Sequence, residues 1–253
     1  MKTGHKSISL KKGWLILLTA VIVTAGVSVW QAGRFYQRRT NAAIQAYMES
    51  HRISQGYRRI TNAWAGTLEA GEADVAFLGD SLTAAGEWNA LFPELRIKNL
   101  GVSGDTIQDV HSRLMLLENL QPQKCFLLIG VNDLWLETWQ QETPAKILKA
   151  YEELLNGMLK TQQSTQQEIF VQSLLPVREE EIEAAFLKNE LIRSINEGIK
   201  RLAEERGLIY IDVHSALAGE DGQLKKEYSA DGLHLTPLGY EVWSGALRPY
   251  VER

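Results

Sequence analysis

A regular alternation of short apolar runs with longer amphipathic stretches, from residue 73 onward, restricts the fold more than any other feature. The short runs predict five strands, at 74–78, 96–100, 124–129, 168–174 and 208–213. The longer stretches predict helices over 106–119, 144–162, 184–206 and 237–251. Strands that alternate with helices form a parallel sheet with helices on both faces. We therefore expect one α/β domain over residues 73–253.

Polar, glycine-bearing turns come directly after the predicted strands. In parallel sheets, reactive groups gather beyond the carboxyl ends of the strands. The groups that could carry chemistry here are a serine, a glycine-rich turn, an asparagine and an aspartate–histidine pair. They stand in the segments 79–83, 101–105, 130–133 and 231–237. We expect these four segments to meet at one edge of the sheet.

Ser81, Asp231 and His234 are residue types suited to a nucleophile, an orienting carboxylate and a general base. A serine hydroxyl is a weak nucleophile until a base takes its proton, and an imidazole titrates near neutral pH. Asp231 can accept the other imidazole N–H and hold the useful tautomer. Attack on an ester carbonyl creates an oxyanion, which preorganised donors stabilise. The expected donors are the backbone N–H groups of Ser81 and Gly101 and the side-chain amide of Asn132.

The order of these blocks resembles the Ser-Gly-Asn-His hydrolases, also called GDSL esterases and lipases. The similarity covers residues 73–251 and rests on Gly-Asp-Ser-Leu at 79–82, Asn-Leu-Gly at 99–101, Gly-x-Asn-Asp at 130–133 and Asp-x-x-His at 231–234. The string that begins at Asn99 is most similar to the branch of platelet-activating-factor acetylhydrolase catalytic subunits and bacterial acylhydrolases. The resemblance implies a flavodoxin-like, three-layer α/β/α sandwich of five parallel strands. It also implies the same catalytic and oxyanion roles for the five residues named above.

Other residues near these blocks have expected roles at the site. Asp80 and Asp133 are expected to hold their turns by hydrogen bonding. Trp135 and Trp139 either wall an acyl pocket or pack in the core. Arg178 faces either an anionic substrate group or solvent.

The sequence calls for no cofactor and no metal. The turn at 101–104 lacks both the Lys of a phosphate-binding loop and the three-glycine spacing of a dinucleotide site. The scattered histidines and carboxylates have no metal-ligand spacing, and the single cysteine, Cys125, excludes zinc sites built from several thiolates. Cys125 is expected to be an inert buried residue. His214, two residues after Asp212, is a weaker candidate for the base than His234.

The first 39 residues differ in charge from the rest of the chain. They carry seven Lys or Arg and no acid, whereas the remaining 214 residues carry 20 basic and 31 acidic residues. An acidic domain of this kind is a poor partner for nucleic acid.

Residues 13–30 form an uncharged apolar stretch behind the basic segment 1–12. The length is near the lower limit for crossing a hydrocarbon core of about 30 Å, and the stretch also has the character of a signal peptide. Because no clean cleavage motif is present after it, we expect an uncleaved transmembrane anchor and a helical stalk over 31–72. The lysines before the anchor favour a cytoplasmic N-terminus. The domain would then lie outside the cytoplasm, and it would be secreted if the segment is cleaved.

These observations predict a membrane-anchored serine esterase that cleaves a carboxylic ester through an acyl-enzyme. Two substrate classes fit, a short-chain O-acyl ester such as an acetyl ester and a lipid ester. The alternatives are a lipase-type acylhydrolase directed at phospholipids or thioesters, and a non-catalytic member of the fold that binds carbohydrate or lipid.

Overall fold

The computed structural model describes residues 69–137, 143–182 and 187–253, together with five positions between 56 and 67. The compact unit that contains them spans Ile53–Arg253. The segments predicted as a basic leader and a membrane anchor, at 1–12 and 13–30, lie outside the described residues, as does most of the stalk expected at 31–72. Within the described part of the chain, no helix is both long and apolar enough to span a bilayer.

All five predicted strands are confirmed, and their ends differ from the prediction by at most two residues. They are β1 (Val75–Gly79), β2 (Ile97–Gly101), β3 (Lys124–Leu128), β4 (Glu168–Gln172) and β5 (Ile209–Ile211). Every pairing is parallel and the strand order is β2-β1-β3-β4-β5. All residues of β1 and β3 are buried, because helices cover both faces of the sheet.

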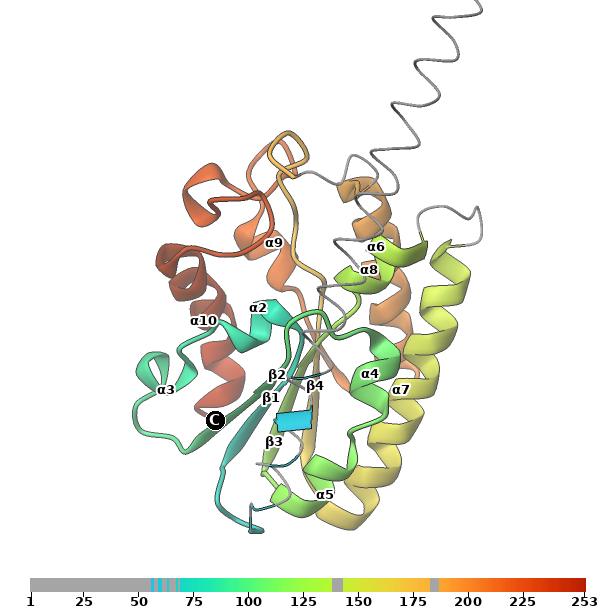
Figure 1. Cartoon of the computed structure of the whole chain (residues 1–253), viewed down its shortest axis with the longest axis vertical. Coiled ribbons are helices and arrows are strands. Elements are labelled where there is room, and N and C mark those ends of the chain that lie inside the picture. The colour runs from blue at the N-terminus through green and yellow to red at the C-terminus, as the bar shows by residue number, and fades with distance from the viewer. Residues whose placement is uncertain are drawn as a thin grey trace, which may run out of the picture. The chain divides into compact units, whose positions relative to one another are not determined.

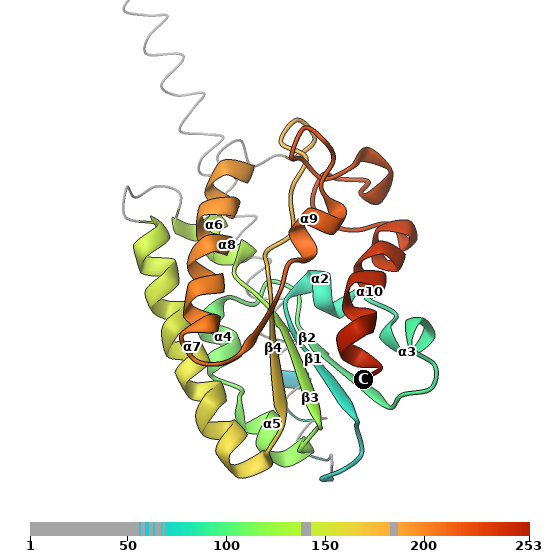
Figure 2. The ribbon, with the colours of Figure 1, turned by 180° about the vertical axis from the view of Figure 1, so that it is seen from behind.

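Helices form one layer on each side of the sheet, as Figures 1 and 2 show from opposite directions. One layer contains α4 (Ile107–His111), α5 (Met115–Leu120), α7 (Thr143–Thr165) and α8 (Asn189–Glu204). The other contains α3 (Trp88–Leu91) and α10 (Pro237–Val251). The expected three-layer α/β/α architecture is therefore confirmed.

The long helices at the end of the chain agree with the prediction, and the region after β2 does not. A single helix was expected over 106–119, but the structure has α4 and α5 with a turn at 112–114 between them. Thr106 begins α4 with a capping box, in which Thr106 and Asp109 each accept from the other's backbone N–H. The apolar periodicity continues across the turn, so it did not reveal the break.

The structure also has four short helices and a 3₁₀ turn that the periodicity did not predict. They are α2 (Ser81–Ala84), α6 (Val131–Glu137), α9 (Val213–Leu217) and η1 (Lys226–Tyr228), besides α3. Each is too short to show a helical pattern of apolar residues. Three of them, α2, α6 and α9, begin within three residues of the end of a strand, and two of these strand ends carry candidate segments.

An aromatic stack fills the core between the sheet and α10. Phe77, Phe126 and Phe170 occupy neighbouring register positions on β1, β3 and β4, with ring centroids 5.2 Å and 4.4 Å apart. Trp88 of α3 stacks on Phe77 at 4.1 Å, and Trp243 of α10 meets Trp88 edge-on at 4.9 Å. This packing locks α3 and α10 onto the first strands, and those elements border the candidate site.

The chain reverses its direction of travel across the sheet at β1. It adds β2 on one side of β1 and then crosses back to add β3, β4 and β5 on the other. In open α/β sheets a crevice forms outside the carboxyl ends of the strands at such a switch point. The segments after β1 and β3 contain Ser81 and Asn132 and lie at that switch point.

Candidate active site

Ser81 is the first residue of α2, directly beyond the end of β1. Asp80 is the N-cap of this helix, and its Oδ1 accepts the backbone N–H of Leu82 at 2.9 Å. Asp is among the residues that cap helix N-termini best, because the short side chain satisfies a free N–H. The Gly-Asp-Ser sequence therefore ends a strand and starts a helix within two residues. The N–H groups of the first helical turn have no partner inside the helix, so that of Ser81 can serve another acceptor.

Side chains from three other elements hold the backbone of α2. Trp88 Nε1 donates to the Thr83 carbonyl at 2.9 Å, and Tyr240 Oη donates to the Leu82 carbonyl at 2.7 Å. Asn99 Nδ2 donates to the carbonyls of Thr83, Ala84 and Gly86 at 3.0, 3.1 and 3.2 Å. A four-residue helix is marginal by itself, so these bonds determine where Ser81 stands. The sequence did not assign these roles to Trp88, Tyr240 or Asn99.

Ser81, His234 and Asp231 form one continuous hydrogen-bonded chain. Ser81 Oγ lies 3.1 Å from His234 Nε2, and His234 Nδ1 lies 2.7 Å from Asp231 Oδ2. The other carboxylate oxygen, Oδ1, accepts the backbone N–H groups of Leu233 and His234 at 3.0 and 2.7 Å. A carboxylate with its lone pairs used in this way is fixed in orientation, and so is the imidazole bound to it.

The loop that carries Asp231 and His234 is tied to its surroundings by its own backbone. Ser229 Oγ donates to the His234 carbonyl at 2.7 Å, which closes the loop on itself. Arg178 donates its backbone N–H to the Gly232 carbonyl at 2.9 Å. Gly232 has a φ of 82°, a backbone conformation that residues other than glycine rarely adopt. The glycine between the two functional residues therefore allows the turn that brings both to Ser81.

Two opposing effects act on the pKa of Asp231. Partial burial alone would raise the pKa, but hydrogen bonds from the His234 ring and from the backbone N–H groups of Leu233 and His234 outweigh it. The net result is an Asp231 pKa below the ordinary value of 3.8. Asp231 is therefore an anion across the neutral pH range, as a partner of a protonated imidazole has to be.

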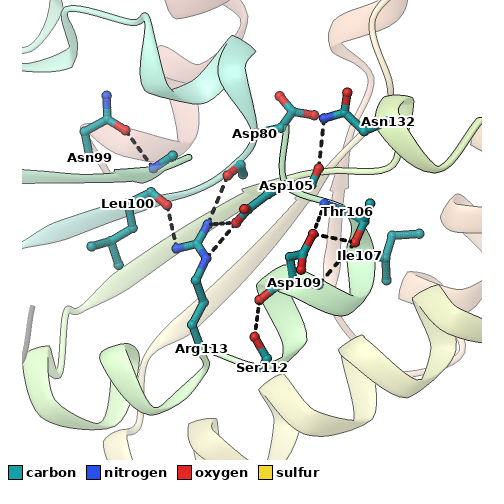
Figure 3. Close-up of polar contacts among 12 residues, drawn as sticks. Asp80, Asn99, Leu100, Asp105, Thr106, Ile107, Asp109, Ser112, Arg113 and Asn132 are labelled. Carbon is teal, nitrogen blue, oxygen red and sulfur yellow. Dashed lines mark hydrogen bonds and ion pairs between the residues drawn. The ribbon is translucent and has the colours of Figure 1, made fainter. Parts of the chain in front are cut away.

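Asn132 is the second residue of α6, beyond β3. Its side-chain Nδ2 donates to the backbone carbonyl of Asp105 at 2.9 Å (Figure 3). An amide nitrogen carries two hydrogens, so the bond to Asp105 orients the group and leaves one N–H for another acceptor.

The position of Gly101 differs from the prediction. Its N–H was expected to stabilise an oxyanion, but it donates to Asn99 Oδ1 at 2.9 Å. A Cβ at residue 101 would lie 2.3 Å from the backbone nitrogen of Ala84. Glycine is therefore required here because β2 passes in close contact with α2. The Asn-Leu-Gly motif therefore positions α2, the helix that begins with Ser81, and Asn99 is its polar partner.

The turn after Gly101 offers other N–H groups. Those of Val102, Asp105, Thr106 and Ile107 donate to the Gly79 carbonyl, the Val102 carbonyl, Asp109 Oδ2 and Asp133 respectively. Within the described residues, the N–H groups of Ser103 and Gly104 have no such acceptor. Gly104 has a φ of 78°, so the backbone turns sharply at this point.

Asp80 and Asp133 both bind backbone N–H groups. Asp133 receives the N–H of Ile107 at 3.0 Å, which joins the start of α4 to α6. Asp80 is completely buried, and burial together with the neighbouring charges of Asp105 and Asp133 raises its pKa to about 7. In the described part of the chain, Asp80 Oδ2 has no hydrogen-bond partner.

The other candidate residues lie in different surroundings. Arg178 is half-buried beside the 231–234 loop, and its Nε has no hydrogen-bond partner among the described residues. The side chain of Trp135 and the whole of Trp139 lie outside the described residues. Cys125 is buried in β3, and burial raises the pKa of its thiol to about 12.

His214 lies apart from the Ser81 hydroxyl. It is buried in α9, and its backbone N–H donates to Ser173 Oγ at 2.8 Å. Asp212 is the N-cap of α9, and its carboxylate accepts the backbone N–H and the hydroxyl of Ser215 at 3.0 and 2.6 Å. The Asp212 carboxylate therefore caps the N-terminus of α9. No group of three or more His, Cys, Asp or Glu side chains in the described ranges could hold a metal ion.

Comparison with known proteins agrees with the fold and with the four sequence blocks. The profile of the GDSL-like lipase/acylhydrolase family matches residues 77–242, from the middle of β1 into α10. The chain belongs to this family, whose members are hydrolases of acyl groups.

Two individual relatives share sequence with the chain, and one solved structure shares both its sequence and its fold. Platelet-activating factor acetylhydrolase IB subunit alpha1 of Rattus norvegicus is 30% identical over 195 residues, which cover 72% of this chain and 76% of the rat protein. Subunit alpha2 of Homo sapiens is 30% identical over 176 residues, with 67% and 72% covered. A solved structure described as a platelet activating factor from Streptococcus pneumoniae is 29% identical with a TM-score of 0.67, and covers 81% of this chain and 93% of its own.

Proposed function

We propose that the protein is a serine esterase in which Ser81, His234 and Asp231 form the catalytic triad. The observation that carries the proposal is the hydrogen-bonded chain from Ser81 Oγ to His234 Nε2, 3.1 Å, and from His234 Nδ1 to Asp231 Oδ2, 2.7 Å. Its position at the carboxyl edge of the sheet, at the switch point beside β1, supports the same conclusion.

The reaction proceeds in two halves. His234 Nε2 takes the proton of Ser81 Oγ while that oxygen attacks the ester carbonyl carbon and forms a tetrahedral oxyanion. The intermediate collapses, the alcohol leaves with the proton from His234, and the acyl group stays on Ser81. A water molecule then loses a proton to His234 and attacks the acyl carbon. When this second intermediate collapses, His234 returns the proton to Ser81 Oγ, and the acid is released.

Three N–H groups can stabilise the oxyanion. Two were expected from the sequence, the backbone N–H of Ser81 and the side-chain amide of Asn132. The third comes from the turn after β2, where the N–H of Gly101 donates to Asn99, whereas those of Ser103 and Gly104 have no such acceptor among the described residues. We assign it to Gly104, where the backbone turns sharply at a φ of 78°. Removal of a single oxyanion donor costs roughly 3–4 kcal/mol of transition-state stabilisation in comparable enzymes.

A short acyl group, such as acetyl, is the substrate class that we favour. The curated relatives carry the name acetylhydrolase, which states an acetyl group as the part removed. Lipid esters and thioesters are the competing substrates. A series of p-nitrophenyl esters from acetate to palmitate separates them by chain length.

The full-length protein should hydrolyse such esters, and Ser81→Ala and His234→Ala should each lower kcat by about 10⁴-fold or more. Ser215→Ala is the matched control, because Ser215 also lies beside an Asp and a His but away from Ser81. A fluorophosphonate probe should label the native protein and the Ser215 variant, and leave Ser81→Ala unlabelled. Labelling without turnover of any ester would point to an untested natural ester. Absence of both would favour the non-catalytic binding protein.

We further propose that residues 13–30 anchor the protein in a membrane with the catalytic domain outside the cytoplasm. The uncharged apolar stretch and the four lysines that precede it support this proposal. Protein from a membrane fraction should resist extraction by alkaline carbonate, and external protease should digest the domain in intact cells. Release of a shortened, soluble chain would instead indicate a cleaved signal peptide.

A further inference from the structure

Arg113 and Asp105 form a completely buried ion pair beneath the candidate site. Arg113 Nε and Nη2 both lie 2.8 Å from Asp105 Oδ2, and neither side chain is exposed. Burial of two charges carries a large desolvation cost, and a well-packed apolar pair of similar volume often does as well or better. The pair therefore calls for an explanation beyond the filling of the core.

The same guanidinium joins the ends of two strands. Arg113 Nη1 donates to the Leu100 carbonyl at 2.7 Å, and Nη2 donates to the Gly79 carbonyl at 3.1 Å (Figure 3). Gly79 is the last residue of β1, two residues before Ser81, and Leu100 is near the end of β2. The guanidinium is planar and rigid, so it fixes its acceptors relative to one another.

Asp105 connects the Arg113 guanidinium to the proposed oxyanion donors. Its carboxylate binds Arg113, while its backbone carbonyl accepts Asn132 Nδ2 at 2.9 Å. Gly104, the donor that we assign in the turn, immediately precedes Asp105 in the chain. One fully buried arginine thus orders the β1 end before Ser81, the Gly104 turn and the Asn132 amide.

We propose that Arg113 is a positioning residue that aligns the Asn132 amide, one of the proposed oxyanion donors, through Asp105, an inference that rests on the proposed function. The turn at 112–114 that separates α4 from α5 places Arg113 where its side chain runs back under the strand ends. Arg113 does not touch the reacting atoms. Its effect should therefore appear in the rate of the chemical step.

The test is a double-mutant cycle in the full-length protein with Arg113→Lys and Asn132→Ala. A lysine keeps the charge beside Asp105, but its single nitrogen cannot also span both strand carbonyls. Arg113→Lys should lower kcat by about 100-fold with little change in KM, since misplaced catalytic groups cost about this much. Asn132→Ala should lower kcat by roughly 10²- to 10³-fold. In the Asn132→Ala background, Arg113→Lys should cost less than about 10-fold, because the group that it positions is gone.

Arg206→Lys is the matched control. Arg206 also binds a carboxylate, a side-chain amide and a backbone carbonyl, those of Glu152, Asn156 and Leu202, but it comes after α8, away from the site. Its variant should keep the native kcat. If Arg113→Lys does not fold, Asp105→Asn replaces it in the same cycle, because the backbone carbonyl that binds Asn132 is retained.

Two results would overturn the proposal, and they are distinguishable. If the native protein is active and the two losses in kcat multiply in the double variant, Arg113 is a purely structural residue, and the esterase proposal stays intact. A native protein that neither turns over esters nor reacts with the fluorophosphonate would overturn the proposed function, and this proposal with it.

Discussion

At the scale of single residues, Asp80, the neighbour of Ser81, has a strongly perturbed pKa. The carboxyl of Asp80 is fully buried and caps the helix that Ser81 begins. Burial, and then the charges of Asp105 and Asp133, raise its pKa to about 7 against an ordinary value of 3.8. Asp80 is therefore largely protonated in the folded protein at mildly acidic pH, when it would be ionised in the unfolded chain.

This shift predicts a pH dependence of stability that Asp80→Asn removes. Below about pH 4 the carboxyl is protonated in both states and contributes no pH dependence. Between about pH 4 and pH 7 the unfolded chain releases the proton first, so the native free energy of unfolding falls as pH rises. Asn remains uncharged and caps helices as well as Asp. Relative to the native protein, the variant should gain on the order of 4 kcal/mol by pH 8, seen in urea unfolding at a series of pH values.

Asp221→Asn provides the control for this measurement. Asp221 also accepts the N–H two residues ahead, that of Gln223, but it is exposed. Its variant should match the native curve throughout. Parallel curves for native protein and Asp80→Asn would contradict the assignment of a neutral, buried Asp80.

At the scale of elements, the contact between β2 and α2 determines where Ser81 stands. Gly101 brings the β2 backbone against Ala84 of α2, and Asn99 bonds to three carbonyls at the end of that helix. Tyr240 of α10 holds the same helix from the other layer. A strand, β2, and the C-terminal helix α10 thus fix a helix of only four residues.

Gly101→Ala should displace α2. The new Cβ would lie 2.3 Å from the Ala84 nitrogen and 2.7 Å from its Cα, and backbone atoms cannot turn aside. We expect a loss of about 1–3 kcal/mol in the free energy of unfolding, from overpacking, together with a lower kcat. Gly245→Ala in α10 is the control, because no atom lies within 4 Å of the new Cβ.

That control should move stability in the opposite direction. An alanine in the interior of a helix is favoured over glycine by about 0.5–1 kcal/mol. Denaturant unfolding and ester turnover of both variants give the comparison. A Gly101→Ala protein as stable and active as the native one would show that β2 and α2 can separate without consequence.

At the scale of the whole molecule, the described sheet and its two helical layers belong to one compact unit. The unit spans Ile53–Arg253 and contains the aromatic core, all five strands, and Ser81, Asp231 and His234. The hydrogen bonds that we describe at the site all join residues of this unit. The catalytic domain should therefore fold without residues 1–52.

A chain that begins at Ile53 should unfold in a single cooperative transition and hydrolyse esters with the kcat of the full-length protein. Coincident thermal transitions by far-UV and near-UV circular dichroism would test the two-state behaviour. The full-length protein in detergent is the reference. Aggregation of the shortened chain, or loss of its near-UV signal, would show that the N-terminal region is part of the fold.

The sequence by itself determined the strands, the long helices and the segments that meet at the sheet edge. Apolar periodicity is a local property, and parallel strands bring the segments after them to one edge. The sequence also identified Ser81, His234 and Asp231 as candidates, because residue type and the order of the blocks can be read directly from the sequence.

The tertiary structure decided which donor serves which acceptor. The N–H of Gly101 goes to Asn99, the helix expected over 106–119 breaks at 112–114, and Arg113 reaches carbonyls 13 and 34 residues away. None of these has a local signal, because each depends on how distant segments pack and on which buried polar group remains to be satisfied. The chain order thus specifies the chemical groups of the site, and long-range hydrogen bonding in a closed core specifies their alignment.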